Sequence, residues 1–345
     1  MRQKNKLELS IIIPVFNEEH YLDKLFTQLI KYFNKKEYEI IFVNDGSTDS
    51  SKNKIENFKI RKDYAFSLQI IHLNNNLGKG RAVREGINNS LGKYVILQDA
   101  DLELDLKDSK ELFEIITNND EIKCIFGSRY LSGKLIKHNY FLNELIGKFN
   151  SFIFNILFGQ SLSDMHCGLK VLHRDVLNKI NLSINDFGLE IDLASQIVRN
   201  NFFIYEFGVA YYSRTIKEGK KLTWVDGIKS YYYLFKVRFI DNSLSTKLSI
   251  IYSSIYMTFV GSYFGMGLGK TLFMVVFFIS GLVIGLKNKL ISSSLIFLSI
   301  YIGSLFGKGQ GKVLSVIIFF IIGLYFAKKI RRINNHKNTM LDILI

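Results

Sequence analysis

Cysteine and proline are scarce in this sequence. Two Cys in 345 residues exclude a disulfide scaffold and a Cys-rich zinc module. A single Pro excludes Pro-rich linkers. Apolar residues, in contrast, make up 48% of the chain and aromatic residues 14%, which excludes a disordered or collagen-like protein. The length is enough for one large or two modest folded domains.

Acidic residues are missing from the last third of the chain. None occurs between Asp241 and Asp342, whereas about 11 Lys and Arg residues follow position 245. This third therefore carries about +10 of the net charge of +14, and the first two thirds are nearly balanced. A basic groove for nucleic acid would not be confined to apolar sequence, so we expect no nucleic-acid partner.

Four uncharged, mostly apolar runs fill the acid-free region. They cover 248–269, 271–286, 290–307 and 313–327, and basic residues separate them. A helix that spans a membrane needs about 20 residues, or about 17 where the bilayer thins. Flanking Lys side chains can extend the shorter runs. We therefore expect four transmembrane helices; the alternative is a buried helical hairpin of a soluble protein.

The densest basic group, 328–332, follows the fourth run. Basic residues concentrate on the cytoplasmic side of membrane proteins, so we expect a cytoplasmic C-terminus. An even number of spans returns the N-terminal part to the same side. We expect no signal peptide, because Asn17-Glu18-Glu19 cuts short the apolar run at 9–16. The expected protein is thus a multi-pass protein of the cell membrane with its N-terminal domain in the cytoplasm.

The first two thirds of the chain alternate between buried strands and amphipathic helices. Residues 18–33 place apolar side chains at helical spacing. Ser47-Thr48-Asp49 is a typical start for a second helix, and a third is expected at 78–90. This alternation predicts an α/β domain with a mostly parallel sheet, whose ligands bind at the carboxyl ends of the strands. The expected strands are 9–16, 38–44, 68–73, 94–98 and 123–127.

An alternating set of carboxylates follows the fourth expected strand. In extended backbone, Asp99, Asp101 and Glu103 share one face, and three carboxylates on one face repel unless a cation neutralises them. Hard oxygen ligands select Mg²⁺ or Mn²⁺, with substrate phosphates completing the shell. An acidic turn or helix cap is the alternative. Asp45 is likewise either a turn residue before Gly46 or an acceptor for a base or ribose.

Three further features each have two interpretations. His166, with one neighbouring Cys, offers too few ligands for zinc, and we expect it to be a packing residue. Glu190 and Asp192 are either candidates for a general base or solvated helix residues. The Phe- and Tyr-rich helices expected at 142–158 and 222–239 carry Lys and Arg. That composition favours a position in a membrane interface over an ordinary core.

Several of these segments together resemble the family 2 glycosyltransferases. They most resemble the branch similar to dolichyl-phosphate mannose synthase, the polyprenyl-phosphate glycosyltransferases, and the resemblance runs from about residue 8 to about 240. Phe16 stands where the family more usually has Tyr, and Glu103 where its best-known members have Gln. The segments are IPVFNEE at 13–19, VNDGSTD at 43–49, GKG at 78–80, AVR at 82–84, DADLE at 99–103, GSRY at 127–130, DMHCGLK at 164–170 and RTIKEGKK at 214–221.

The resemblance implies a GT-A fold, a nucleotide-sugar donor, Mg²⁺ or Mn²⁺, and an isoprenoid phosphate acceptor. It implies that Asp101 and Glu103 bind the metal, and that Arg129, Arg214 and Lys220 hold phosphates. The expected catalytic residues are Asp99, Asp101, Arg129, Arg214 and Lys220. The expected donor-binding residues are Pro14, Phe16, Glu18, Val43, Asp45, Lys79, Asp99 and Ala100.

Residues 213–221 resemble the mobile loop of this branch. Ile216 is the one apolar residue that could anchor them, so we expect the loop to be mobile without ligand. We expect it to close when donor diphosphate and acceptor phosphate are bound, as lids do in other enzymes.

The expected organisation is a GT-A glycosyltransferase domain over 1–221, an interfacial amphipathic helix over 222–244 and a membrane domain over 245–345. The expected function is metal-dependent, inverting transfer of a sugar from a nucleotide-sugar donor to a polyprenyl phosphate at the cytoplasmic face of the membrane. The alternatives are a family 2 transferase that acts on a growing glycan or glycolipid, a non-enzymatic membrane scaffold, and a transporter. The sugar, the base and the presence of a homo-oligomer stay open.

Overall fold

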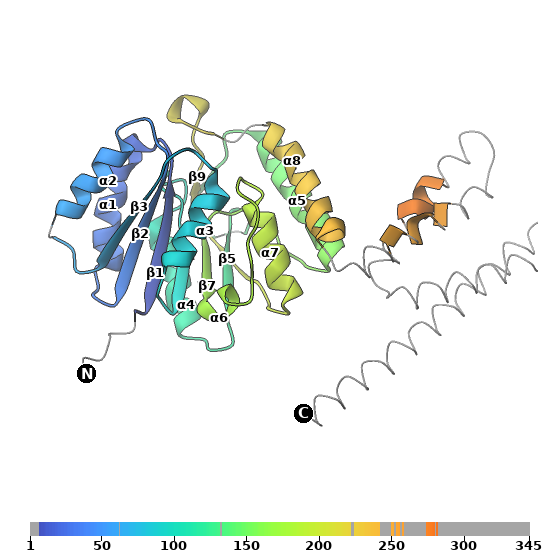
Figure 1. The fold of residues 1–345 in the computed structure, drawn as a ribbon, viewed down its shortest axis with the longest axis horizontal. Coiled ribbons are helices and arrows are strands. Elements are labelled where there is room, and N and C mark those ends of the chain that lie inside the picture. The colour runs from blue at the N-terminus through green and yellow to red at the C-terminus, as the bar shows by residue number, and fades with distance from the viewer. Residues whose placement is uncertain are drawn as a thin grey trace, which may run out of the picture. The chain divides into compact units, whose positions relative to one another are not determined.

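A seven-stranded sheet runs through the first two thirds of the chain (Figure 1). The chain divides into two compact units, Met1–Arg238 and Phe239–Ile345, and the sheet belongs to the first. This computed structural model describes residues 7–61, 63–131, 133–221, 224–241, 250–251, 253–255, 257–258, 274–279 and 281.

The strand order in the sheet is β3-β2-β1-β4-β7-β5-β8. Strands β1 to β4 pair in parallel, as do β5 and β8, whereas β7 is antiparallel to its neighbours β4 and β5. A second, two-stranded sheet pairs β6 with β9. The strands are β1 (Leu9–Val15), β2 (Tyr38–Asp45), β3 (Ser67–Leu73), β4 (Tyr94–Leu97), β5 (Cys124–Ser128), β6 (Ile136–Lys137), β7 (Lys170–His173), β8 (Tyr205–Gly208) and β9 (Tyr211–Tyr212).

Helices cover both faces of the large sheet. Successive strand residues point to opposite faces. Ile11 and Ile13 of β1 therefore join one apolar cluster with α1, α2 and α4, while Ile12 joins another with α3, α5, α7 and α8. The helices are α1 (Glu19–Phe33), α2 (Ser51–Ile60), α3 (Lys79–Asn89), α4 (Leu106–Thr117), α5 (Phe141–Phe158), α6 (Arg174–Leu177), α7 (Leu189–Arg199) and α8 (Trp224–Phe235), with the 3₁₀ helix η1 (Ile216–Glu218) and the π-helix η2 (Lys236–Ile240).

The five expected strands and the three expected helices of the alternating part are confirmed, with boundary shifts of a few residues. Strands β7 and β8 were not predicted. β7 begins at Lys170, a charged residue whose side chain is nevertheless fully buried, with its ammonium 4.8 Å from the ring centroid of Phe126. Four residues are too few to show a period, and a buried lysine hides the strand further.

Gly78 shapes the turn that leads into α3. Its φ of +97° and ψ of 154° form a combination that is essentially restricted to glycine, and a Cβ there would lie 2.5 Å from the carbonyl oxygen of Asn185. We expect Gly78→Ala to destabilise the protein by about 3 kcal/mol. That loss corresponds to a fall of roughly 6–12 °C in the melting temperature of the unit Met1–Arg238.

Gly159→Ala is the matched control for this prediction. Gly159 also has a positive φ, +65°, but among the described residues no atom beyond its own chain neighbours lies within 4 Å of its Cβ position. The control should therefore carry only a backbone strain of about 1 kcal/mol. Equal losses of stability in the two variants would contradict the prediction.

The third and fourth expected membrane runs and the basic group at 328–332 lie outside the described residues, as does most of the first run and more than half of the second. Within the described ranges, no helix is long and apolar enough to cross a membrane. Helix α8 is described, and it packs against α5 and α7. It therefore belongs to the same compact unit as the expected domain 1–221, and this unit ends at Arg238.

Candidate functional site

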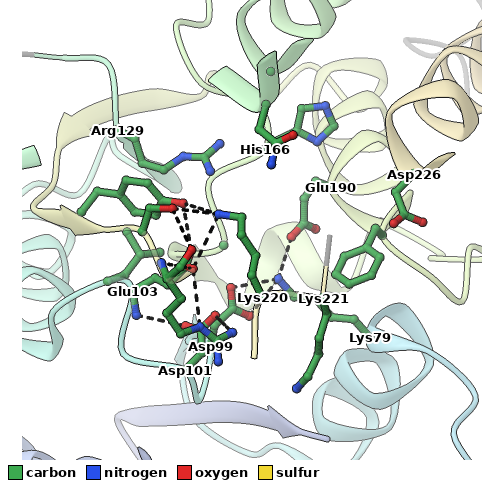
Figure 2. A pocket seen from close by; sticks show the side chains of 18 of the residues that line it. Lys79, Asp99, Asp101, Glu103, Arg129, His166, Glu190, Lys220, Lys221 and Asp226 are labelled. Carbon is green, nitrogen blue, oxygen red and sulfur yellow. Dashed lines mark hydrogen bonds and ion pairs between the residues drawn. The ribbon is translucent and has the colours of Figure 1, made fainter. Parts of the chain in front are cut away.

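A cavity of about 390 Å³ opens beside the carboxyl ends of β1, β2 and β4. It is lined by Phe16 and Asp45, which follow the first two strands. The carboxylates that follow β4 also line it (Figure 2). Asn143 of α5 and Ser230 of α8 complete the wall from the helical side. The cavity thus connects the strand ends with the paired helices α5 and α8.

The structure brings nearly all the expected site residues to this cavity. Every expected catalytic and metal-binding residue lines it, and so do seven of the eight expected donor-binding residues. Val43 differs: it is fully buried and packs with Ile41 and Ala82, away from the cavity lining. The residues that line it as expected are Pro14, Phe16, Glu18, Asp45, Lys79, Asp99, Ala100, Asp101, Glu103, Arg129, Arg214 and Lys220.

Interlocked loops hold the nucleoside end of the cavity. Asn17 has a positive φ of 52°, and its Oδ1 accepts a hydrogen bond from the backbone of Thr48 at 2.8 Å. The backbone N–H of Glu18 donates to Ser51 Oγ at 2.8 Å. The loop after β1 is therefore tied to the loop after β2, and the buried Glu18 carboxylate lines the cavity.

Asp45 organises the turn before α3. Its two carboxylate oxygens accept hydrogen bonds from the backbone N–H groups of Leu77 and Gly78, at 2.8 and 2.9 Å. This contact favours the positioning role among the two interpretations of Asp45. The residue still lines the cavity, so it fixes the wall on which a nucleoside would rest.

Arg214 lies among the carboxylates in the middle of the cavity. Its Nη1 is 2.8 Å from Glu18 Oε2 and its Nη2 is 2.7 Å from Asp101 Oδ2. The backbone N–H of Arg214 donates to Glu103 Oε1 at 2.9 Å, and the Tyr211 hydroxyl donates to Glu103 Oε2 at 2.8 Å. The guanidinium thus neutralises a set of acids that would otherwise repel one another.

Asp101 and its neighbour Asp99 differ in the direction of their pKa shifts. Burial, together with the neighbouring carboxylates of Asp99, Glu103 and Glu18, raises the pKa of Asp101 to about 7 although Arg214 opposes the shift. For Asp99, burial raises the pKa but the ammonium of Lys79 outweighs it, so the net shift is downward. The two neighbouring acids therefore differ in their need for a further cation.

This donor set fits a hard divalent cation. Every acid in it offers oxygen ligands, and a bound cation would offset the burial and the carboxylate neighbours that raise the pKa of Asp101. In the part of the chain that the structure describes, no group of three or more His, Cys, Asp or Glu side chains is placed to hold a metal ion by itself. Magnesium is commonly held by one or two carboxylates plus substrate phosphates, which agrees with that arrangement.

Lys79 links the acid set to helix α7. Its ammonium lies 2.8 Å from Asp99 Oδ1 and 2.9 Å from Glu190 Oε1 (Figure 2). Glu190 is 6% exposed and lines the cavity, whereas Asp192, 3% exposed, accepts hydrogen bonds from the backbone of Ser183 and Ile184. Of the two interpretations of these acids, the one as solvated helix residues is therefore wrong. The helical period alone does not show that α7 faces a cavity.

Arg129 is held by a buried partner. It forms a two-pronged ion pair with Asp164, with Nε 2.7 Å from Oδ2 and Nη2 2.8 Å from Oδ1. Its guanidinium carbon also lies 5.2 Å from the ring centroid of Tyr211. Asp164 has no exposed surface, and its own N–H donates to Glu206. The pair fixes the plane of the guanidinium at the cavity wall.

His166 is a cavity residue and not simply a packing residue. It lines the cavity, and its buried Nε2 has no hydrogen-bond partner in the described part of the chain. Burial lowers the pKa of His166 to about 4, so the ring is neutral near pH 7. The motif at 164–170 was the sequence signal that could have placed His166 at the site. A lone His beside one Cys did not by itself suggest a ligand-binding residue.

Polar contacts hold the loop 213–221, which was expected to be mobile without ligand because Ile216 is its one apolar residue. Ile216 is 74% exposed. Thr215 and Glu218 form a capping box around η1, and the Lys220 ammonium lies 2.9 Å from Ser213 Oγ. Lys221 pairs with Glu18 at 2.5 Å. With the ion pairs of Arg214, these contacts hold the loop over the acid set.

The outer side of α5 is apolar. Side chains spaced three or four residues apart are about half exposed or more, and they come from a helix that also lines the cavity. Figure 1 shows α5 and α8 side by side at the end of this unit far from α1 and α2, and the two helices are in contact. The exposed apolar residues of α5 are Phe141, Leu142, Leu145, Phe149, Phe152 and Ile156.

Comparisons with known proteins agree with this arrangement. Residues 10–180 match the family described as "Glycosyl transferase family 2". The dolichyl-phosphate beta-glucosyltransferase of Dictyostelium discoideum is 30% identical over 239 residues, which cover 64% of this chain and 72% of that protein. The dodecaprenyl-phosphate galacturonate synthase of Rhizobium johnstonii is 27% identical over 180 residues, 51% of this chain and 51% of that protein.

Solved structures show the same fold. Glucosyl-3-phosphoglycerate synthase from Mycobacterium tuberculosis, in complex with Mn²⁺, UDP-glucose and glycerol 3-phosphate, superposes with a TM-score of 0.52 at 15% identity. The match covers 70% of this chain and 83% of that one. The fold and the cavity at its strand ends define a glycosyltransferase of the GT-A class. The chain belongs to glycosyltransferase family 2.

Proposed function

We propose that this enzyme transfers a sugar from a nucleotide-sugar donor to a polyprenyl phosphate. The observation that carries the proposal is the course of the cavity, from the strand ends to α5 and α8, whose outer side presents an apolar stripe. A donor nucleotide fits the strand-end side, and a lipid phosphate fits the helical side. The relatives named above, which act on dolichyl and dodecaprenyl phosphates, support the same acceptor class.

The reaction needs no strong general base. A phosphate monoester carries about −1.5 to −2 charge at neutral pH and is already a nucleophile. One of its oxygens attacks the anomeric carbon, a new glycosidic C–O bond forms, and the bond to the nucleoside diphosphate breaks. Attack from the side opposite the leaving group inverts the anomeric centre. The enzyme contributes position and charge.

Cationic side chains on the cavity wall supply that charge. Arg214 and Lys220 come from the loop 213–221, and Arg129 is oriented by Asp164. Asp101 and Glu103 are the residues that would hold a divalent cation, with Asp99 beside them. Such a cation supplies positive charge to the leaving diphosphate when it is bound. We propose that this cation is Mg²⁺ or Mn²⁺.

A donor and acceptor screen tests the function. The purified full chain is incubated with radiolabelled nucleotide sugars and three acceptors: undecaprenyl or dolichyl phosphate, the matching polyprenol without phosphate, and a soluble oligosaccharide. We expect label to enter the lipid phase only with the polyprenyl phosphate. Equal labelling of the soluble oligosaccharide would favour the glycan transferase instead.

The same proposal includes attachment to a membrane. The exposed apolar residues of α5, with Lys148 on the same helix, suit a position in a membrane interface. We extend this role to 222–244 and assign four spans to 245–345.

With both termini in the cytoplasm, a reporter fused after Ile345 should report the cytoplasmic side, and one fused near Gly309 the far side. A far-side C-terminus would mean an odd number of spans.

A further inference from the structure

The relatives transfer different kinds of sugar: one is named for a neutral glucosyl group and another for galacturonate, which carries a carboxylate. The wall of the cavity can distinguish these two classes by charge. The place where a sugar would lie follows from the order of bonds in the donor, nucleoside, diphosphate and then sugar. The proposed function puts the nucleoside at Asp45 and the acceptor at α5 and α8, and on that basis we place the sugar between the acid set and those helices.

Glu190 and His166 form the wall of this intermediate part (Figure 2). One oxygen of Glu190 pairs with Lys79, and the other makes no hydrogen bond in the described part of the chain. Gly168 brings the backbone after His166 close to the acid set, because a Cβ at Gly168 would lie 2.0 Å from Asp99 Oδ2. The wall therefore adjoins Asp99 directly.

Two buried polar atoms that lack partners among the described residues belong to side chains that line the same cavity. Buried polar atoms normally have hydrogen-bond partners, yet His166 Nε2 and Asn150 Oδ1 have none in the described residues, and both side chains line the cavity. Asn150 is 2% exposed. With the second oxygen of Glu190, they offer three hydrogen-bonding positions that sugar hydroxyls can fill.

Resting on the proposed function, we propose that Glu190 and His166 bind hydroxyl groups of the transferred sugar and restrict the donor to a neutral hexose. Asp99 and Glu190 place two carboxylates at this wall, and among the described residues Lys79 is the one cation within 4 Å of either. The carboxylate of a hexuronosyl group would be repelled there, whereas hydroxyl groups can donate to Glu190. Glu190 and His166 are thus specificity-determining residues of the donor site.

Donor binding without acceptor tests this proposal separately from the transfer reaction. Titration with UDP and GDP first selects the nucleotide that the full chain binds. The matching pair is then compared, UDP-glucose with UDP-glucuronate or GDP-mannose with GDP-mannuronate. We expect the neutral donor to bind the wild type about a hundredfold more tightly than the uronate. Equal or tighter binding of the uronate would overturn the proposal.

Two substitutions of Glu190 separate charge from shape. Glu190→Gln should weaken binding of the neutral donor about tenfold, because a hydrogen bond to a charged group is lost. It should also reduce the ratio of neutral-donor to uronate-donor affinity about tenfold or more. Glu190→Asp keeps the negative charge but moves it away from the sugar, because the Asp side chain is shorter. Binding of the neutral donor should therefore weaken, while the uronate donor should still bind poorly. His166→Phe should weaken the neutral donor and leave the free nucleotide unaffected.

The control is Glu114→Gln, which makes the same chemical change on the exposed side of α4. It should alter neither donor. Binding of the free nucleoside diphosphate should stay constant in every variant, which shows that the protein is folded. If Glu190→Gln leaves the hexose preference unchanged, the sugar does not contact this wall. Failure of transfer to polyprenyl phosphate would overturn the proposed function but leave these binding differences intact.

Discussion

Asp101→Asn should lower sugar transfer by about three orders of magnitude or more while the protein folds normally. Asn has nearly the same shape as Asp but no charge, and Asp101 is the acid whose environment most favours a further cation. The variant keeps a hydrogen-bonding group near Arg214 and so preserves the local structure. The expected loss is that of a residue that acts through charge on the leaving diphosphate.

The measurement is transfer activity across a Mn²⁺ and Mg²⁺ titration, together with a melting curve of each variant. Asp63→Asn makes the same change at an exposed ion pair with Arg61, outside the cavity, and should keep full activity. Wild-type activity that persists in excess EDTA would show that the acid set works without a metal. Normal transfer by Asp101→Asn would remove Asp101 from the reaction.

The alternating part of the fold follows from local sequence features. Ile11, Ile12 and Ile13 form a continuous apolar run because β1 is buried on both faces, and such a run is visible without any tertiary contact. The insertion of β7 between β4 and β5 is a different matter. It depends on pairing between residues about 75 positions apart, such as Val95 and Leu172, which no local period encodes.

The candidate site divides in the same way. Asp99 and Asp101 were predicted because they directly follow a strand, and parallel strands gather their carboxyl ends at one edge of the sheet. Glu190 lies on a helix, about 90 residues later, and only its contact with Lys79 shows that it belongs to the cavity. Val43 lies outside the cavity lining, and the sequence does not say to which face of β2 such a buried residue points.

Arg214→Ala should lower transfer by about two to three orders of magnitude, which is the scale of losing one preorganised charge donor at a transition state. Arg214 is 8% exposed and lies within hydrogen-bond distance of both Glu18 and Asp101, so it links the loop 213–221 to the acid set. Arg214→Lys should recover part of the activity, because it keeps the charge but loses the two-pronged geometry.

Two further measurements separate this role from a merely structural one. Lys217→Ala is the matched control, since Lys217 lies on the same loop but is exposed and does not line the cavity, and it should transfer normally. Trypsin cleavage reports the state of the loop. In the wild type, nucleotide with Mn²⁺ should slow cleavage after Lys217 and Lys220, and in Arg214→Ala this protection should be weaker. If Arg214→Ala transfers normally and nucleotide leaves cleavage unchanged, then the ion pairs of Arg214 only fasten a surface loop.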